Sequence, residues 1–147
     1  MIFERIEFFM KEAIKEAQIS FDTNCVPVGA IIVLNNEIVG KGRNKSDSFL
    51  MHAEIECIRN AERNLSTKYL DECEIFVTME PCMMCFYAIF LSKMRRVFFG
   101  AFSDNDFESE YLCKNKVESY GGFLEKESSE LLKTFFLSKR KKNVDFK

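Results

Sequence analysis

Residues 74–101, EIFVTMEPCMMCFYAIFLSKMRRVFFGA, decide the fold class of this chain. The stretch 74–79 is short, apolar and rich in β-branched residues, which is typical of a buried strand. Pro81 lacks the N–H that the first residue of a helix leaves unbonded, so it predicts the first position of a helix that CMMCFYAIFLSK continues. RRVFFGA at 95–101 predicts the next strand. Strand, helix and strand at this spacing indicate a parallel crossover unit.

The segments before this unit predict a helix and a hairpin. Residues 2–19 place apolar side chains at helical spacing, which indicates an amphipathic helix. PVGAIIVL at 27–34 and EIVGKG at 37–42 predict two strands. Asn35 and Asn36 lie between them and tolerate the positive φ of a tight turn, so the two strands form a hairpin.

The remaining segments complete an α/β pattern. Residues 52–65 predict a second amphipathic helix, 116–122 a short fifth strand, and 124–142 a final helix, while 103–115 predict a loop or a short helix. The inward residues predicted for the final helix are Leu131, Leu132, Phe135 and Phe136. The predicted fold class is a three-layer α/β/α arrangement around a central mixed five-stranded sheet.

Composition and charge limit the class of protein. The chain has 147 residues, 47% of them hydrophobic, which predicts one domain, residues 1–147, with a substantial core. A net charge of −2 argues against a protein coated in basic charge for general nucleic-acid binding. Charged side chains interrupt the apolar N-terminal stretch, so neither a signal peptide nor a membrane span is expected, and a cytoplasmic location is predicted.

Six cysteines occur in the chain. In a reducing compartment we expect free thiols or metal ligands rather than disulfides. Small buried apolar residues are predicted at Cys25, Cys57, Cys73 and Cys113.

His52 is the only histidine of the chain and begins the stretch HAEIECI. Cys82 and Cys85 lie one helical turn apart, so both sulfurs can face the same ion. Thiolates and imidazole bind zinc tetrahedrally, and a catalytic site keeps the fourth position open for water. A closed structural site would need a fourth cysteine, and the sequence has no second pair at metal-ligand spacing. His52, Cys82 and Cys85 therefore predict one catalytic Zn²⁺ per chain.

Proton transfer at such a site needs a carboxylate that is close to the water but free of the metal. Glu54 is the candidate, and Glu56 is a rival by proximity alone. Both motifs are predicted at helix N-termini, where N–H groups and the helix dipole favour thiolates and hydroxide. Residues two apart do not share a face of a regular helix, so we expect His52 at the very start of its helix.

Each of these signals has a structural alternative when it is taken alone. A single histidine beside an apolar run is most often a structural residue, and a single C-x-x-C pair can be redox-active or coincidental. His-Ala-Glu at one predicted helix start and Pro-Cys-x-x-Cys at the next, with one strand between them, together favour zinc catalysis.

The pattern H-x-E followed by P-C-x-x-C is the signature of zinc-dependent base deaminases, and the chain resembles this superfamily. Within it, the chain is similar to the bacterial tRNA-specific adenosine deaminases. The landmarks of this similarity are VPVGA (26–30), Asn44, HAE (52–54), VTMEPCMMC (77–85), RVFFGA (96–101) and ELLKTFFLSKRKK (130–142). They span nearly the whole chain.

The resemblance implies a cytidine-deaminase-like fold, a homodimer, and hydrolytic deamination of adenosine to inosine at the wobble position of tRNA. The anticodon arm of the tRNA would be the partner, without a membrane. Zinc-activated hydroxide would attack C6 of the flipped base, with Glu54 as the proton shuttle. By the same resemblance Asn44 would hold the nucleoside, and Val28 and Ala53 would line the pocket. Judged without the resemblance, Asn44 is an ordinary loop residue that bonds its own backbone.

One segment departs from the family's pattern. After FGA the family usually continues with Asp-x-Lys-x-Gly, whereas FSDNDFESEY (102–111) is acidic here. Phosphates repel acidic loops, so the alternative is a zinc-dependent deaminase of a free base or nucleoside, such as cytosine, cytidine or guanine. A catalytically silent binding subunit with structural zinc is a second alternative, and Glu54 argues against it.

Basic residues gather near the end of the sequence, at Lys139, Arg140, Lys141 and Lys142. This local excess predicts contacts with the phosphates of an RNA substrate. The alternative is that these cations are stabilised by the dipole at a helix C-terminus and bind nothing.

Overall fold

The computed structural model describes residues 1–103 and 117–145, and in the last helix it describes side chains as far as residue 140. Most of the acidic stretch after FGA, the predicted loop or short helix and Cys113 lie outside the described residues. The predictions made for them stay predictions.

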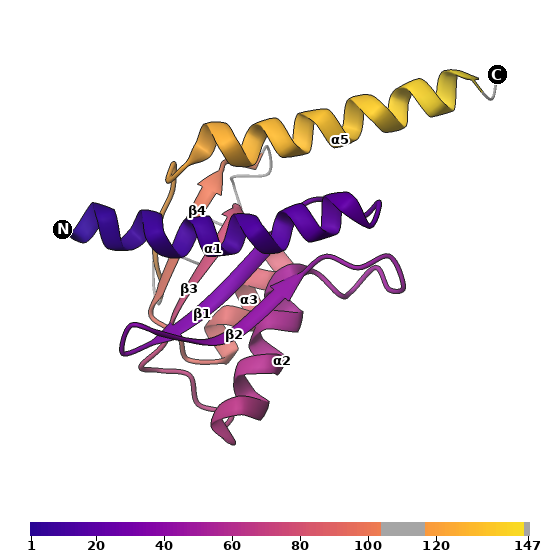
Figure 1. The fold of residues 1–147 in the computed structure, drawn as a ribbon. Coiled ribbons are helices and arrows are strands. Elements are labelled where there is room, and N and C mark those ends of the chain that lie inside the picture. The colour runs from indigo at the N-terminus through magenta and orange to yellow at the C-terminus, as the bar shows by residue number, and fades with distance from the viewer. Residues whose placement is uncertain (104–116, 146–147) are drawn as a thin grey trace.

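Five strands of the described chain form one mixed sheet (Figure 1). Their bounds are β1 (Gly29–Leu34), β2 (Glu37–Arg43), β3 (Glu74–Met79), β4 (Arg96–Ala101) and β5 (Glu118–Tyr120). The order across the sheet is β2-β1-β3-β4-β5. β1 pairs antiparallel with both β2 and β3, whereas β3, β4 and β5 run parallel to one another. The predicted mixed sheet and its crossover unit are confirmed.

Helices cover both faces of this sheet. Their bounds are α1 (Ile2–Asp22), α2 (Ala53–Leu65), α3 (Met83–Leu91) and α5 (Glu125–Asp145). α1 and α5 pack on one face, and α2 and α3 pack on the other, which gives the predicted three layers (Figure 1). In the described part of the chain, no helix is both long enough and apolar enough to cross a membrane.

The core lies on both sides of β1, whose residues from Gly29 to Val33 are all buried. Ala30 and Ile32 pack into the cluster that contains residues of α2, while Ile31 and Val33 pack into the cluster that contains residues of α1. This alternation follows from the two-residue period of a strand. It makes β1 the platform on which both helix layers rest.

The hairpin turn and the buried cysteines agree with the sequence. Asn35 and Asn36 have φ angles of 51° and 64°, as predicted for the turn between β1 and β2. The predicted burial is confirmed for the described cysteines of that group, which are Cys25, Cys57 and Cys73.

Two details of the sequence prediction are wrong. Pro81 is not the first residue of α3, because Cys82 has the extended backbone of an N-cap and the helix begins at Met83. The carbonyl of Cys82 accepts the first helical hydrogen bond, from the N–H of Phe86 at 2.9 Å. Phe136 is 46% exposed rather than inward, since the buried side of α5 is formed by Ser128, Leu132 and Phe135.

Candidate active site

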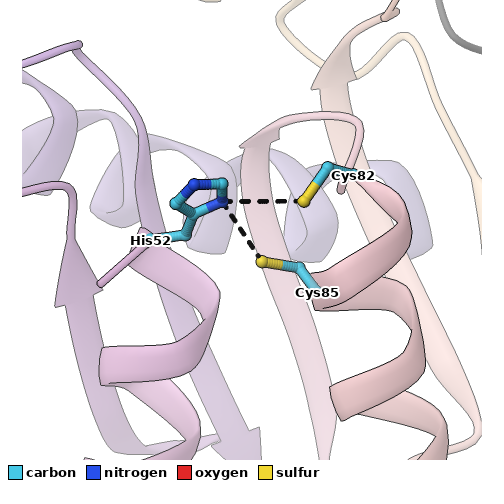
Figure 2. Close-up of side chains that lie close together, drawn as sticks. All are labelled: His52, Cys82 and Cys85. Carbon is cyan, nitrogen blue, oxygen red and sulfur yellow. Dashed lines mark hydrogen bonds between the residues drawn. The ribbon is translucent and has the colours of Figure 1, made fainter. Parts of the chain in front are cut away.

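The N-termini of α2 and α3 lie side by side (Figure 2). His52 is the N-cap of α2, with φ −70° and ψ 158°, and Cys82 is the N-cap of α3, with φ −70° and ψ 172°. Cys85 follows in the first turn of α3. The prediction that both motifs lie at helix N-termini is confirmed, and His52 precedes the first helical residue by one position.

The three predicted ligands converge on one point (Figure 2). Nδ1 of His52 lies 3.6 Å from Sγ of Cys82 and 3.5 Å from Sγ of Cys85. In a tetrahedral site with Zn–S of about 2.3 Å and Zn–N of about 2.05 Å, a nitrogen and a sulfur ligand lie about 3.6 Å apart. His52, Cys82 and Cys85 are therefore positioned to bind one zinc ion, with Nδ1 as the histidine donor.

The two thiols differ in their affinity for protons. The pKa of Cys82 is lowered to about 5, chiefly because the Cys85 thiol donates a hydrogen bond to it, and the Cys85 N–H and His52 add to the effect. The pKa of Cys85 is raised, first because its proton bonds Cys82 and then because the thiol is buried near Glu54. Zinc takes both sulfurs as thiolates, so its binding would release the proton of Cys85.

Glu54 lies beside this cluster in the first turn of α2 and is only 4% exposed. Burial raises its pKa to about 7, the nearby charge of Cys82 adds to the rise, and its own backbone N–H and His52 oppose it. A carboxyl group with a pKa near neutrality can both accept and release a proton at physiological pH. Glu54 thus has the environment that a proton shuttle needs.

Glu56, the rival carboxylate, has a different partner. Its Oε2 lies 2.7 Å from Nζ of Lys45 in the loop that precedes α2. This ion pair joins Glu56 to the loop, whereas the pKa of Glu54 responds to the charges of Cys82 and His52. Glu54 remains the better candidate.

Asn44 connects the end of β2 to the start of α2. Its Oδ1 accepts a hydrogen bond of 2.7 Å from the N–H of Ala53. Its own N–H donates to the carbonyl of Val28 at 3.1 Å, and its carbonyl accepts from Oγ of Ser20 at 2.8 Å. The side chain therefore bonds a residue nine positions away rather than its own backbone, and its amide nitrogen remains as a donor.

A pocket of about 300 Å³ opens beside His52. Asn44 and His52 line it, together with Phe49, Met51 and Phe135. The other predicted substrate contacts, Val28 and Ala53, are buried next to Asn44 and are not among the lining residues. Their contact with a substrate stays a prediction.

The basic cluster begins near this pocket. Nζ of Lys139 lies 5.5 Å from the ring centroid of Phe135, and Phe135 lines the pocket. Arg140 is exposed one residue further along α5. Lys141 and Lys142 belong to α5, and their side chains lie outside the described residues.

Sequence reasoning missed Ser20 and Phe49. Ser20 is a fully buried hydroxyl on the apolar side of α1, and its position at helical spacing from Ala13 and Ala17 was the available signal. Phe49 and Leu50 are consecutive apolar residues inside a polar loop, a pattern that indicates an exposed apolar surface.

Comparison with known proteins defines the class. The model of the cytidine and deoxycytidylate deaminase zinc-binding region matches residues 3–101. The three-layer fold and the His-Cys-Cys cluster agree with this match, so the class is that of the zinc-binding deaminases.

Relatives narrow the class further. The chain is 40% identical over 141 residues to a tRNA-specific adenosine deaminase of Rickettsia bellii, a match that covers 86% of this chain and 97% of that one. A match to the enzyme of the same name from Aquifex aeolicus is 47% identical over 98 residues, 65% of each chain. The chain therefore belongs to the tRNA-specific adenosine deaminases.

Solved structures agree. A tRNA:A34 deaminase studied for A-to-I editing at the wobble position of transfer RNA superposes with a TM-score of 0.78 at 32% identity, covering 85% of this chain and 99% of that one. A guanine deaminase from Nitrosomonas europaea has a TM-score of 0.77 at 22% identity, covers 88% of this chain and 83% of that one, and shares the fold alone.

Proposed function

We propose that this chain is a zinc-dependent hydrolase that deaminates adenosine to inosine at the wobble position of a tRNA. The observation that carries the proposal is the convergence of His52, Cys82 and Cys85 beside the buried Glu54, in a chain 40% identical over 141 residues to a tRNA-specific adenosine deaminase.

The residues around the site divide the chemistry between them. A zinc ion held by His52, Cys82 and Cys85 would supply a Lewis acid that lowers the pKa of water to about 7. Adenosine and water give inosine and ammonia, so one proton must pass from the water to the ring and one to the departing amine. Glu54, a carboxyl group whose pKa is raised by burial, accepts and delivers these protons from a position shielded from solvent.

Asn44 holds the nucleoside in this proposal. Its oxygen already accepts from Ala53, so its amide nitrogen is the group that donates to the substrate. Val28 and Ala53 form apolar walls next to it.

The anticodon arm binds across the pocket beside His52 towards α5. Lys139 supports this placement, because it lies over the ring of Phe135, which lines the pocket. Lys139, Arg140, Lys141 and Lys142 then contact phosphates of the RNA.

A homodimer and a cytoplasmic location are parts of the same proposal. The exposed side of α3 supports the dimer, since Met83, Tyr87 and Leu91 follow at intervals of four residues and are 52%, 49% and 59% exposed. An apolar stripe of this kind can be covered by the same stripe of a second copy.

The cytoplasmic location is supported by the tRNA that the name of the relatives gives as their substrate.

Incubation of the zinc-loaded protein with an anticodon stem-loop tests the function. We expect mass analysis of the digested nucleosides to show inosine at the wobble position, and none from a stem-loop with a different base there. Free adenine, adenosine, cytosine, cytidine and guanine are assayed in parallel. Rapid deamination of one of these free compounds, without deamination of the stem-loop, would refute the proposal. It would support a zinc-dependent deaminase of a free base or nucleoside instead.

A further inference from the structure

The zinc ligand Cys82 lies just before α3 and outside the regular secondary structure (Figure 2). β3 ends at Met79, and α3 begins at Met83. Glu80 and Pro81 form the linker between the strand and Cys82. On its other side Cys82 is held as the N-cap of α3. The position of its sulfur therefore depends on what fixes the linker.

Glu80 is bonded twice to the chain that leaves β4. Its N–H donates to the carbonyl of Ala101 at 2.8 Å, which extends the pairing of β3 with β4 beyond Met79. Its carboxylate oxygen Oε1 accepts from the N–H of Ser103 at 3.0 Å. The two bonds close a ring between the ends of the two strands, so a rotation of Glu80 would break at least one of them.

Pro81 carries this restraint to Cys82. Its ring fixes φ at about −65°, and a proline also disfavours helical backbone in the residue before it, which here is Glu80. Pro81 is buried and has no N–H, so Glu80 supplies the only backbone donor of the linker. A displacement of Glu80 would therefore be passed on to Cys82.

The other two ligands have more support from packing. Cys85 is buried in the first turn of α3, and His52 caps a helix that packs on β2. Cys82 is the most exposed of the three. Packing thus contributes least to the position of Cys82, and directional bonds to the linker contribute correspondingly more.

Residues that hydrogen-bond around a metal site orient its ligands, and their loss typically lowers the affinity for the metal about 10- to 100-fold. We propose that Glu80 is a positioning residue of the zinc site. Its bond to the N–H of Ser103 holds the linker against the end of β4 and thereby places the sulfur of Cys82 for the metal. This inference rests on the zinc site of the proposed function and does not depend on the identity of the substrate.

The test uses the full chain loaded with Zn²⁺ or with Co²⁺, whose visible bands report tetrahedral geometry and whose near-ultraviolet charge-transfer absorption reports the bound thiolates. Glu80→Ala should lower the affinity for Zn²⁺ about 10- to 100-fold in competition with a chromogenic chelator. It should also weaken the charge-transfer absorption of the Co²⁺ protein, because Cys82 is held less closely to the ion. Glu80→Gln keeps an oxygen that accepts from Ser103, so its affinity should stay within about threefold of wild type.

Glu74→Ala is the matched control, because Glu74 lies at the opposite end of β3. Its carboxylate pairs with Arg5 at 2.7 Å and with Arg96 at 3.7 Å. This variant loses a carboxylate from the same strand and should have a lower melting temperature. Its affinity for Zn²⁺ and its Co²⁺ spectrum should match those of the wild type.

Ser103→Pro removes the N–H from the other side of the bond, so the proposal stays testable if Glu80→Ala does not fold. Alone, it should reproduce the loss of Zn²⁺ affinity of Glu80→Ala. In the double variant it should add no further loss, because two changes that break the same bond are not additive. Full additivity of the two losses would overturn the proposal.

The remaining outcomes separate this inference from the function on which it rests. Unchanged Zn²⁺ affinity and an unchanged Co²⁺ spectrum in Glu80→Ala would overturn the positioning role and leave the function standing. Equal losses in Glu80→Ala and Glu80→Gln would also overturn it, because the charge and not the hydrogen bond would then matter. A wild-type protein that binds Co²⁺ tetrahedrally but does not deaminate the anticodon stem-loop would overturn the proposed function alone. A wild-type protein that binds neither metal would overturn both.

Discussion

Alanine in place of Gly42 should displace the zinc ligand on α2. A Cβ on Gly42 would lie 2.9 Å from Cβ of Cys57 and well inside contact distance of the Ala53 carbonyl oxygen. Contacting carbon atoms are about 3.5–4.0 Å apart, so the start of α2 would have to withdraw from β2 by about 1 Å. His52 and Glu54 flank Ala53 and must move with it.

This displacement has two measurable effects. Overpacking of this kind costs about 1–3 kcal/mol in the free energy of unfolding. Zinc ligands must lie within about 0.2 Å of their ideal distances, so the affinity for zinc should also fall. A misplacement of about 1 Å lowers the rate of a catalysed step about 100-fold, which is the expected loss in kcat at saturating zinc.

Gly29→Ala is the matched control. A Cβ on Gly29 would lie 2.9 Å from Cβ of Glu16 and well inside contact distance of the Ala13 carbonyl oxygen, so it presses on α1 across the opposite face of the sheet. A similar loss of stability is expected, but α1 carries no zinc ligand.

Three measurements compare the two variants: urea denaturation, competition for zinc with a chromogenic chelator, and single-turnover deamination. Equal loss of zinc affinity in both variants, or a Gly42→Ala protein that binds zinc within twofold of wild type, would refute the reasoning.

Three other changes test separate parts of the proposal. Glu54→Gln should keep one zinc per chain but lower kcat about 100- to 10,000-fold. Metal analysis and single-turnover assays measure the two effects. Rates near those of the wild type would mean that another residue transfers the proton. Truncation after Ser138 should flatten the plot of log K against log salt for the stem-loop by about one unit for each phosphate that the removed cations would have bound, and an unchanged slope would mean that the basic residues only end a helix. Tyr87→Glu should place a charge in the stripe on α3 and give monomers in sedimentation, whereas an unchanged mass would move the dimer contact elsewhere.

Much of the fold could be predicted because its signals are local. The strand at 74–79, the turn at Asn35 and Asn36 and the helices that follow His52 and Cys82 each follow from periodicity or from a turn residue. The zinc cluster was predictable for the same reason, since a single histidine and one cysteine pair leave few ways to complete a site.

Other features depend on contacts that no local pattern contains. Pro81 favours a helix start, but the extended backbone of Cys82 places that start two residues later. The buried hydroxyl of Ser20 reaches Asn44 across 24 positions of sequence, and only the packing of α1 on the sheet brings the two together. Phe136 was predicted inward together with Leu131, Leu132 and Phe135, but consecutive residues point in different directions from a helix, and of the two phenylalanines only Phe135 is buried.

The placement of the zinc ligands also bears on how the chain is tied together. His52 and Cys82 are the N-caps of different helices. A zinc ion bound by both residues would close a loop of the chain that contains all of α2 and β3. A covalent cross-link over such a loop, about 30 residues long, would remove about 3.6 kcal/mol of chain entropy from the unfolded state. A cross-link made by a metal ion differs from a disulfide, because a chelator that removes the ion breaks it without any redox reaction. The stability of the segment between His52 and Cys82 therefore depends on the supply of zinc.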